Sequence, residues 1–178
     1  MWITSFRIAL VPVIVALLAP QQLSFSLMAA GLFILASITD YYDGYYARKY
    51  NAVSNMGKFM DPIADKILVT SILVMLIPYD RIDPYMVIVI LTRDTLISGL
   101  RSVAAADQII IAAQASGKWK TALQMVAIPA VIIGQSWAGI PFDKIGYWTL
   151  WVSTILSVTS GIQYVVGYLK ARSKFSRV

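Results

Sequence analysis

Four aspartates in residues 39–66 have the type and the spacing to carry chemistry: Asp40, Asp43, Asp61 and Asp65. They are four of only nine acidic residues in the 178-residue chain. On helices, spacings of three and four residues place each pair on one face. Four carboxylates in a small apolar volume need neutralising cations, and hard divalent metal ions bound by oxygen ligands fulfil that need. Two such ions suit phosphoryl chemistry, because they hold phosphate oxygens and stabilise attack and departure.

Small residues and one arginine stand at fixed places around these aspartates. The pattern D-x2-D-G-x2-A-R-x8-G-x3-D-x3-D is formed by Asp40, Asp43, Gly44, Ala47, Arg48, Gly57, Asp61 and Asp65. It resembles the signature of the CDP-alcohol phosphotransferase family of integral membrane enzymes, and every fixed position matches. The alternative is that the aspartates only form ion pairs with neighbouring lysines and Arg48. Ion pairing would not require glycine and alanine at those places.

The resemblance implies a role for each matching residue. Two divalent cations, Mg²⁺ or Mn²⁺, are the expected cofactors, with Asp40, Asp43, Asp61 and Asp65 as ligands. Asp65 is also the expected general base. The nucleotide is expected to contact the segment through Asp40, Gly44, Ala47, Arg48 and Gly57. Thr4 and Arg7 resemble a T-x2-R element that helps line the nucleotide site, although a topological anchor is an equal alternative for Arg7.

Two further stretches extend the resemblance over nearly the whole chain. Residues 93–101 (RDTLISGLR) and 117–124 (GKWKTALQ) resemble the family's bacterial phosphatidylglycerophosphate synthases. This implies CDP-diacylglycerol as donor, sn-glycerol 3-phosphate as acceptor, and CMP as the leaving group. Asp94 departs from the pattern, because glutamate is expected there.

Four basic residues outside the motif are predicted to bind the acceptor's phosphate: Arg93, Arg101, Lys118 and Lys120. Arginine can grip a phosphate with two parallel hydrogen bonds. The alternative for these residues is a topological role with contact to anionic lipid.

Composition places the chain in a membrane. It is 58% hydrophobic and 13% charged, with a mean hydropathy of +0.70, whereas soluble domains are about a quarter charged. Without cysteine or histidine, thiol catalysis, disulfides and imidazole chemistry are excluded. The net charge of +6 is typical of basic cytoplasmic loops rather than of nucleic-acid binding.

The motifs must be positioned by helices, which apolar runs predict over residues 3–19, 23–49, 57–77, 85–106, 117–133 and 145–169. A signal peptide is the alternative for the first, but its cleavage site would be poor. Residues 20–22, 51–55, 78–84, 109–116 and 134–144 are predicted connections, and residues 170–178 a basic tail. Six spans place both termini and nearly all basic residues on one side, with only Arg81 and Lys144 opposite.

The predicted fold is therefore an all-α integral membrane protein with six transmembrane helices and both termini cytoplasmic. Residues 1–178 form one catalytic domain with the CDP-alcohol phosphotransferase fold. The expected location is a bacterial inner membrane, with the active site facing the cytoplasm. Family analogy implies a homodimer.

Three alternatives remain open from the residues. The acceptor could be inositol phosphate, serine or phosphatidylglycerol, within the same reaction class. A divalent-cation transporter would need a polar path through both leaflets, but the four aspartates cluster at one side. An intramembrane prenyltransferase also uses aspartates and Mg²⁺, but its motifs are usually farther apart and lack the Gly-x2-Ala-Arg link.

Overall fold

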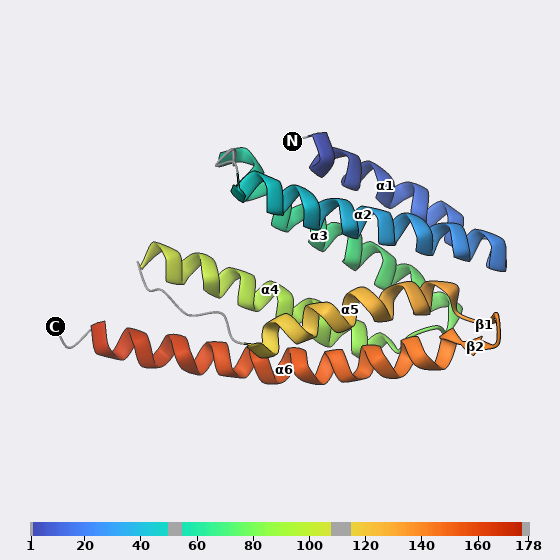
Figure 1. Ribbon diagram of the computed structural model, residues 1–178. Helices are drawn as coiled ribbons and strands as arrows, with labels where there is room; N and C mark the ends of the chain where they lie inside the picture. The colour runs from blue at the N-terminus through green and yellow to red at the C-terminus, as the bar shows by residue number, and fades with distance from the viewer. Residues whose placement is uncertain (1, 50–54, 108–114, 176–178) are drawn as a thin grey trace. The chain divides into compact units, whose positions relative to one another are not determined.

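In this computed structural model the described backbone covers residues 2–49, 55–107 and 115–175. Side chains are described for residues 6–39, 42, 63, 64, 66–107, 117 and 119–173. The helices are α1 (Trp2–Leu18), α2 (Leu23–Lys49), α3 (Asn55–Leu76), α4 (Pro84–Ala106), α5 (Ala115–Ile133) and α6 (Phe142–Phe175), shown in Figure 1. A 3-10 turn, η1 (Ile77–Tyr79), follows α3. The predicted, mostly helical fold is confirmed.

Most predicted helix bounds lie within two residues of the observed ones, but α6 is longer than predicted at both ends. The predicted end at residue 169 is wrong, because α6 continues to Phe175 through part of the predicted basic tail. Lysine, arginine and alanine are strong helix formers, and no glycine or proline interrupts residues 168–175. The basic residues that follow residue 169 therefore do not mark the end of the helix.

Residues with positive φ close three of the connections. Gln21 (φ 54°) ends the turn after α1, where its N–H donates to the carbonyl of Leu18 at 3.2 Å. Asp80 (φ 54°) ends the turn after η1, where its N–H donates to the carbonyl of Ile77 at 3.1 Å. The predicted loop 134–144 contains a small antiparallel hairpin of β1 (Ser136–Trp137) and β2 (Ile140–Pro141). Positive φ at Ala138 and Gly139 is what a two-residue turn between such strands requires.

The chain divides into two compact units, which are described separately. The first comprises Met1–Asp83 with Met125–Tyr147, and the second comprises Pro84–Gln124 with Trp148–Val178. The prediction of one catalytic domain stays a prediction.

In the first unit, α1 packs against both α2 and α3. Buried apolar side chains recur at helical spacing on these three helices; they include Ile14, Leu18, Phe33, Leu68, Ile72 and Leu76. Gly146, at the start of α6, permits a close approach of this helix to α5, since a Cβ there would lie 2.7 Å from the backbone nitrogen of Val131.

Arg81 links three segments of the first unit. Its guanidinium donates to the Ser26 hydroxyl at 3.3 Å and to the carbonyl of Ile132, near the end of α5. A cation is favourable at a helix C-terminus. Burial lowers the pKa of Arg81 below its ordinary value, and the nearby Tyr79 acts in the opposite direction. Gly134 (φ +63°) leaves room for this side chain, because a Cβ there would lie 2.5 Å from Arg81 Nε.

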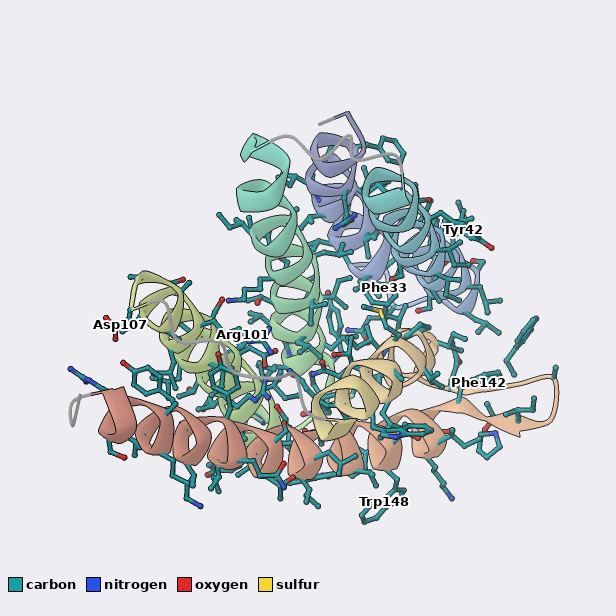
Figure 2. All side chains as sticks on the ribbon, turned by 60° about the vertical axis from the view of Figure 1, so that its left-hand side comes forward. Phe33, Tyr42, Arg101, Asp107, Phe142 and Trp148 are labelled. Atoms are coloured by element: carbon teal, nitrogen blue, oxygen red, sulfur yellow. The ribbon has the colours of Figure 1, made fainter. Side chains whose placement is uncertain are left out.

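In the second unit, α6 has two contrasting faces. Its buried face carries hydroxyl groups at three- and four-residue spacing, from Ser153, Ser157, Ser160, Tyr164 and Tyr168. Its exposed face carries large apolar side chains every seven residues, from Trp148, Ile155, Ile162 and Leu169. Figure 2 shows Trp148 projecting away from the helix. A helix in water has the opposite arrangement, so an apolar solvent is expected around α6.

Within the described residues, one helix is long and apolar enough to cross a membrane, over Phe142–Ser173 of α6. Shorter apolar segments occur in four other helices, over Phe6–Leu18, Leu23–Thr39, Lys66–Tyr79 and Trp119–Ile133. The six-span topology and the cytoplasmic termini stay predictions.

Candidate functional site

The motif residues lie on two helices of the first unit. The C-terminal part of α2 carries Asp40 and Asp43 together with Gly44, Ala47 and Arg48. The N-terminal half of α3 carries Gly57, Asp61 and Asp65. The helical spacing assumed for both aspartate pairs is thus present in the backbone. Figure 1 shows these two helix ends at the same end of the unit.

The side chains of the four motif aspartates lie outside the described part of the structure, as do those of Arg48 and Thr4. Among the side chains that are described, no three acidic residues come together as a metal site. The four-carboxylate site therefore stays a prediction. Its donor set contains only carboxylates, which are the ligands that Mg²⁺ and Mn²⁺ prefer.

Arg7 is buried in the first unit, with 3% of its surface exposed. It lies on α1, the helix that packs against both motif-bearing helices. A topological anchor would extend its charge to the membrane surface, whereas a buried guanidinium requires polar partners. Burial therefore argues against the anchor interpretation, and the role of Arg7 in the nucleotide site stays a prediction.

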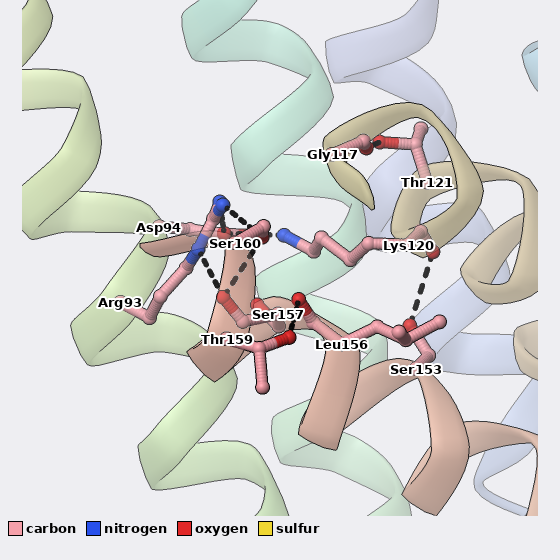
Figure 3. Close-up of polar contacts among 10 residues, drawn as sticks. All are labelled: Arg93, Asp94, Gly117, Lys120, Thr121, Ser153, Leu156, Ser157, Thr159 and Ser160. Carbon is pink, nitrogen blue, oxygen red and sulfur yellow. Dashed lines mark hydrogen bonds and ion pairs between the residues drawn. The ribbon is translucent and has the colours of Figure 1, made fainter. Parts of the chain in front are cut away.

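The second unit brings two of the four predicted phosphate-binding residues together (Figure 3). Lys120 on α5 and Arg93 on α4 both donate to Oδ1 of Asp94, the latter from Nη1 at 2.9 Å. Lys120 is only 5% exposed. Asp94, the position that departs from the family pattern, therefore joins α4 to α5.

The remaining contacts of Arg93 are with α6. Nε donates to the backbone carbonyl of Ser157 at 2.9 Å, and Nη2 donates to the Ser160 hydroxyl at 2.8 Å. The Ser153 hydroxyl donates to the backbone carbonyl of Lys120 at 3.0 Å. The serines of α6 thus hold both basic residues of this cluster.

Of the other two predicted phosphate-binding residues, only Arg101 has a described side chain, and no contact of Arg101 with this cluster is found among the described residues. Arg101 is exposed, farther along α4, with its guanidinium carbon 5.4 Å from the ring centre of Tyr164. This distance is typical of a cation–π contact. Lys118 lies in the first turns of α5, and its side chain is outside the described residues.

The sequence analysis did not identify Ser157, Ser160 or Gly161 as candidate residues. A signal was present, because small and polar residues recur at three- and four-residue spacing in the otherwise apolar α6. Such a stripe is typical of a face that packs against other membrane helices.

Comparison with known proteins identifies the family. A model of the CDP-alcohol phosphatidyltransferase family matches residues 1–159. A protein of Rickettsia typhi named CDP-diacylglycerol–glycerol-3-phosphate 3-phosphatidyltransferase is 40% identical over 164 residues, which are 92% of each chain. A protein of Bacillus subtilis with the same name is 39% identical, over 91% of this chain and 90% of its own. The chain therefore belongs to the CDP-alcohol phosphatidyltransferase family.

Proposed function

We propose that the chain transfers a phosphatidyl group from CDP-diacylglycerol to sn-glycerol 3-phosphate, giving phosphatidylglycerophosphate and CMP. The observation that carries this proposal is the similarity to relatives named for this reaction over nine-tenths of both chains. The complete aspartate motif on α2 and α3 supports the same reaction class.

Asp40, Asp43, Asp61 and Asp65 are the residues that would hold two divalent cations. The fit rests on donor chemistry, because four carboxylates balance two divalent charges and the chain has no histidine or cysteine to compete as ligand. When bound, such ions polarise the donor's diphosphate and stabilise the charge that develops during displacement.

Asp65 is the proposed base. It accepts the proton of the acceptor's 1-hydroxyl as that oxygen bonds to the phosphorus of the phosphatidyl group. The bond from this phosphorus to the bridging oxygen breaks, and CMP leaves with the electron pair. Gly44 and Ala47 would leave space for the nucleotide, and Arg48 would contact the diphosphate. The burial of Arg7 supports a nucleotide-binding role for the Thr4–Arg7 element.

The second unit provides the proposed binding residues for the acceptor's phosphate, which are Arg93, Arg101, Lys118 and Lys120. Charged side chains in apolar helices are costly and are usually retained for function. Arg93 supports this role most directly, because its three contacts with described residues occupy three of its five N–H groups. One N–H remains on each terminal nitrogen, and a phosphate can accept both.

The proposed location is a bacterial inner membrane, with six spans, cytoplasmic termini and a homodimeric assembly. The apolar exposed face of α6 and the shorter apolar segments in four other helices support a membrane location. The distribution of basic residues supports cytoplasmic termini.

The test is CMP release by the purified protein in detergent, with CDP-diacylglycerol and Mg²⁺ or Mn²⁺. Glycerol 3-phosphate, inositol 1-phosphate, serine, phosphatidylglycerol and no acceptor are compared, each with and without EDTA. We expect EDTA-sensitive release with glycerol 3-phosphate only. CMP release with a different acceptor would refute glycerol 3-phosphate as the acceptor. No release from folded protein with any acceptor would refute the enzyme class.

A further inference from the structure

We propose that α6 positions Arg93 for the acceptor's phosphate, with Ser160 as the positioning residue and Gly161 providing the space. This inference rests on the proposed function, because it assumes that Arg93 binds that phosphate. Ser160 and Gly161 lie just beyond residues 1–159, the part that matches the family model.

The Ser160 hydroxyl is oriented to accept a hydrogen bond from Arg93. It is buried, and it donates its own hydrogen to the carbonyl of Ser157 at 3.0 Å. Its lone pairs are therefore available to Nη2 of Arg93, 2.8 Å away. The Ser157 carbonyl accepts from Nε of the same guanidinium. Two points on one helix thus fix the plane of the guanidinium.

Fixing this plane matters because bidentate binding depends on orientation. With Nε held by Ser157 and one N–H of Nη2 held by Ser160, the remaining N–H groups of Nη1 and Nη2 have defined directions. An arginine that rotates freely must lose that freedom when it binds its ligand, and the loss weakens binding.

Gly161 leaves the space that the Arg93 side chain occupies. A Cβ at this position would lie 3.2 Å from Cγ and 3.3 Å from Nε of Arg93. Both distances are shorter than ordinary van der Waals contact, so alanine here would displace the arginine stem by a few tenths of an ångström. Since bidentate contacts need close geometry, this displacement is expected to weaken phosphate binding without removing any polar group.

The surroundings explain why Arg93 needs these contacts. Arg93 lines a groove of about 470 Å³ between α4 and α6, together with apolar residues that include Ile88, Leu96, Ile97 and Ile162. A guanidinium without acceptors beside such a surface carries a large desolvation cost. The contacts from α6 satisfy part of the guanidinium and keep it from adopting other rotamers.

The experiment measures steady-state kinetics with glycerol 3-phosphate, the apparent KM for CDP-diacylglycerol and the thermal unfolding midpoint. The variants are Ser160→Ala, Ser160→Thr, Gly161→Ala and Arg93→Ala. Thr159→Ala is the matched control for a lost hydroxyl, because Thr159 is exposed on the same helix and, among the described residues, its hydroxyl donates only to the Leu156 carbonyl. Gly99→Ala is the control for an added methyl, since a Cβ at that position would have no described atom within 4 Å.

We expect Ser160→Ala and Gly161→Ala each to raise the KM for glycerol 3-phosphate about fivefold, which corresponds to about 1 kcal/mol. The kcat and the donor KM should stay within about twofold, and Ser160→Thr should restore the KM. The Gly161→Ala midpoint should not fall, because alanine favours helix more than glycine. Both controls should match the unsubstituted chain.

Three results would overturn the inference. The first is an unchanged acceptor KM in both Ser160→Ala and Gly161→Ala while Arg93→Ala raises it, because Arg93 would then need no positioning. The second is an unchanged acceptor KM in Arg93→Ala. The third is a fall in kcat without a change in KM. The acceptor comparison on the unsubstituted chain tests the proposed function separately, and an acceptor without phosphate would refute both.

Discussion

Replacing Asp94 by asparagine tests whether this carboxylate holds α4 and α5 together. Asp94 accepts charged hydrogen bonds from Arg93 and Lys120, and asparagine keeps the oxygen but removes the charge. A hydrogen bond to a charged partner contributes about 1.5–3 kcal/mol, and a neutral one about 0.5–1.5 kcal/mol. Two bonds that each lose about 1 kcal/mol predict about 2 kcal/mol of lost stability, or a midpoint lower by about 4–8 °C for a chain of this length.

The assay is thermal unfolding in detergent, followed by tryptophan fluorescence. Asp107→Asn is the matched control, because Asp107 is an exposed carboxylate just after the end of α4 that accepts one hydrogen bond from a described residue, the Tyr168 hydroxyl at 3.0 Å. The Asp107→Asn substitution should lower the unfolding midpoint by only about 2 °C. Asp94→Glu keeps the charge, so its unfolding midpoint should fall less than that of Asp94→Asn. Equal midpoints for Asp94→Asn and Asp107→Asn would refute the reasoning.

Four further predictions concern turnover, acceptor binding and folding. Asp61→Asn should reduce CMP release more than about 100-fold, because losing a metal ligand costs more activity than losing a residue that only contacts a ligand. Near-normal CMP release would argue against the metal site. Asp65→Asn should lower kcat about 100-fold or more with little change in donor KM, and an unchanged kcat would exclude it as base. Arg101→Ala should raise the KM for glycerol 3-phosphate about tenfold; a raised donor KM instead would reassign it. Gly134→Ala should lower stability by about 1–2 kcal/mol through its positive φ and more through crowding. Gly139→Ala shares the positive φ without the crowding, so equal losses would exclude the crowding term.

The helices could be predicted from sequence because each follows from local composition. Apolar runs, turn residues and the motif itself placed α2 with the observed bounds, Leu23–Lys49. The end of α6 could not be placed in this way, because helix propensity continues where apolar composition stops. The small hairpin was missed because strands of two residues carry no periodicity.

The polar contacts of the second unit could be predicted only in part. Arg93 and Lys120 stood out because charges are rare in apolar helices. Their partners on α6 did not, since Arg93 and Ser160 are 67 residues apart in the chain and serine is unremarkable in a membrane helix. Which hydroxyl meets which cation depends on how the helices pack, and a single sequence does not encode that pairing locally.

The length of the exposed apolar stripe of α6 can be compared with the thickness of a lipid bilayer. Trp148 and Leu169, its first and last members, are 21 residues apart, which is roughly 31 Å of helix. The hydrocarbon core of a bilayer is about 30 Å thick. The helix continues to Phe175, so its last turns extend beyond that thickness. If this stripe lies in the hydrocarbon core, α6 would hold Lys170 and Arg172 at the depth of the lipid head groups, where anionic lipids would attract them.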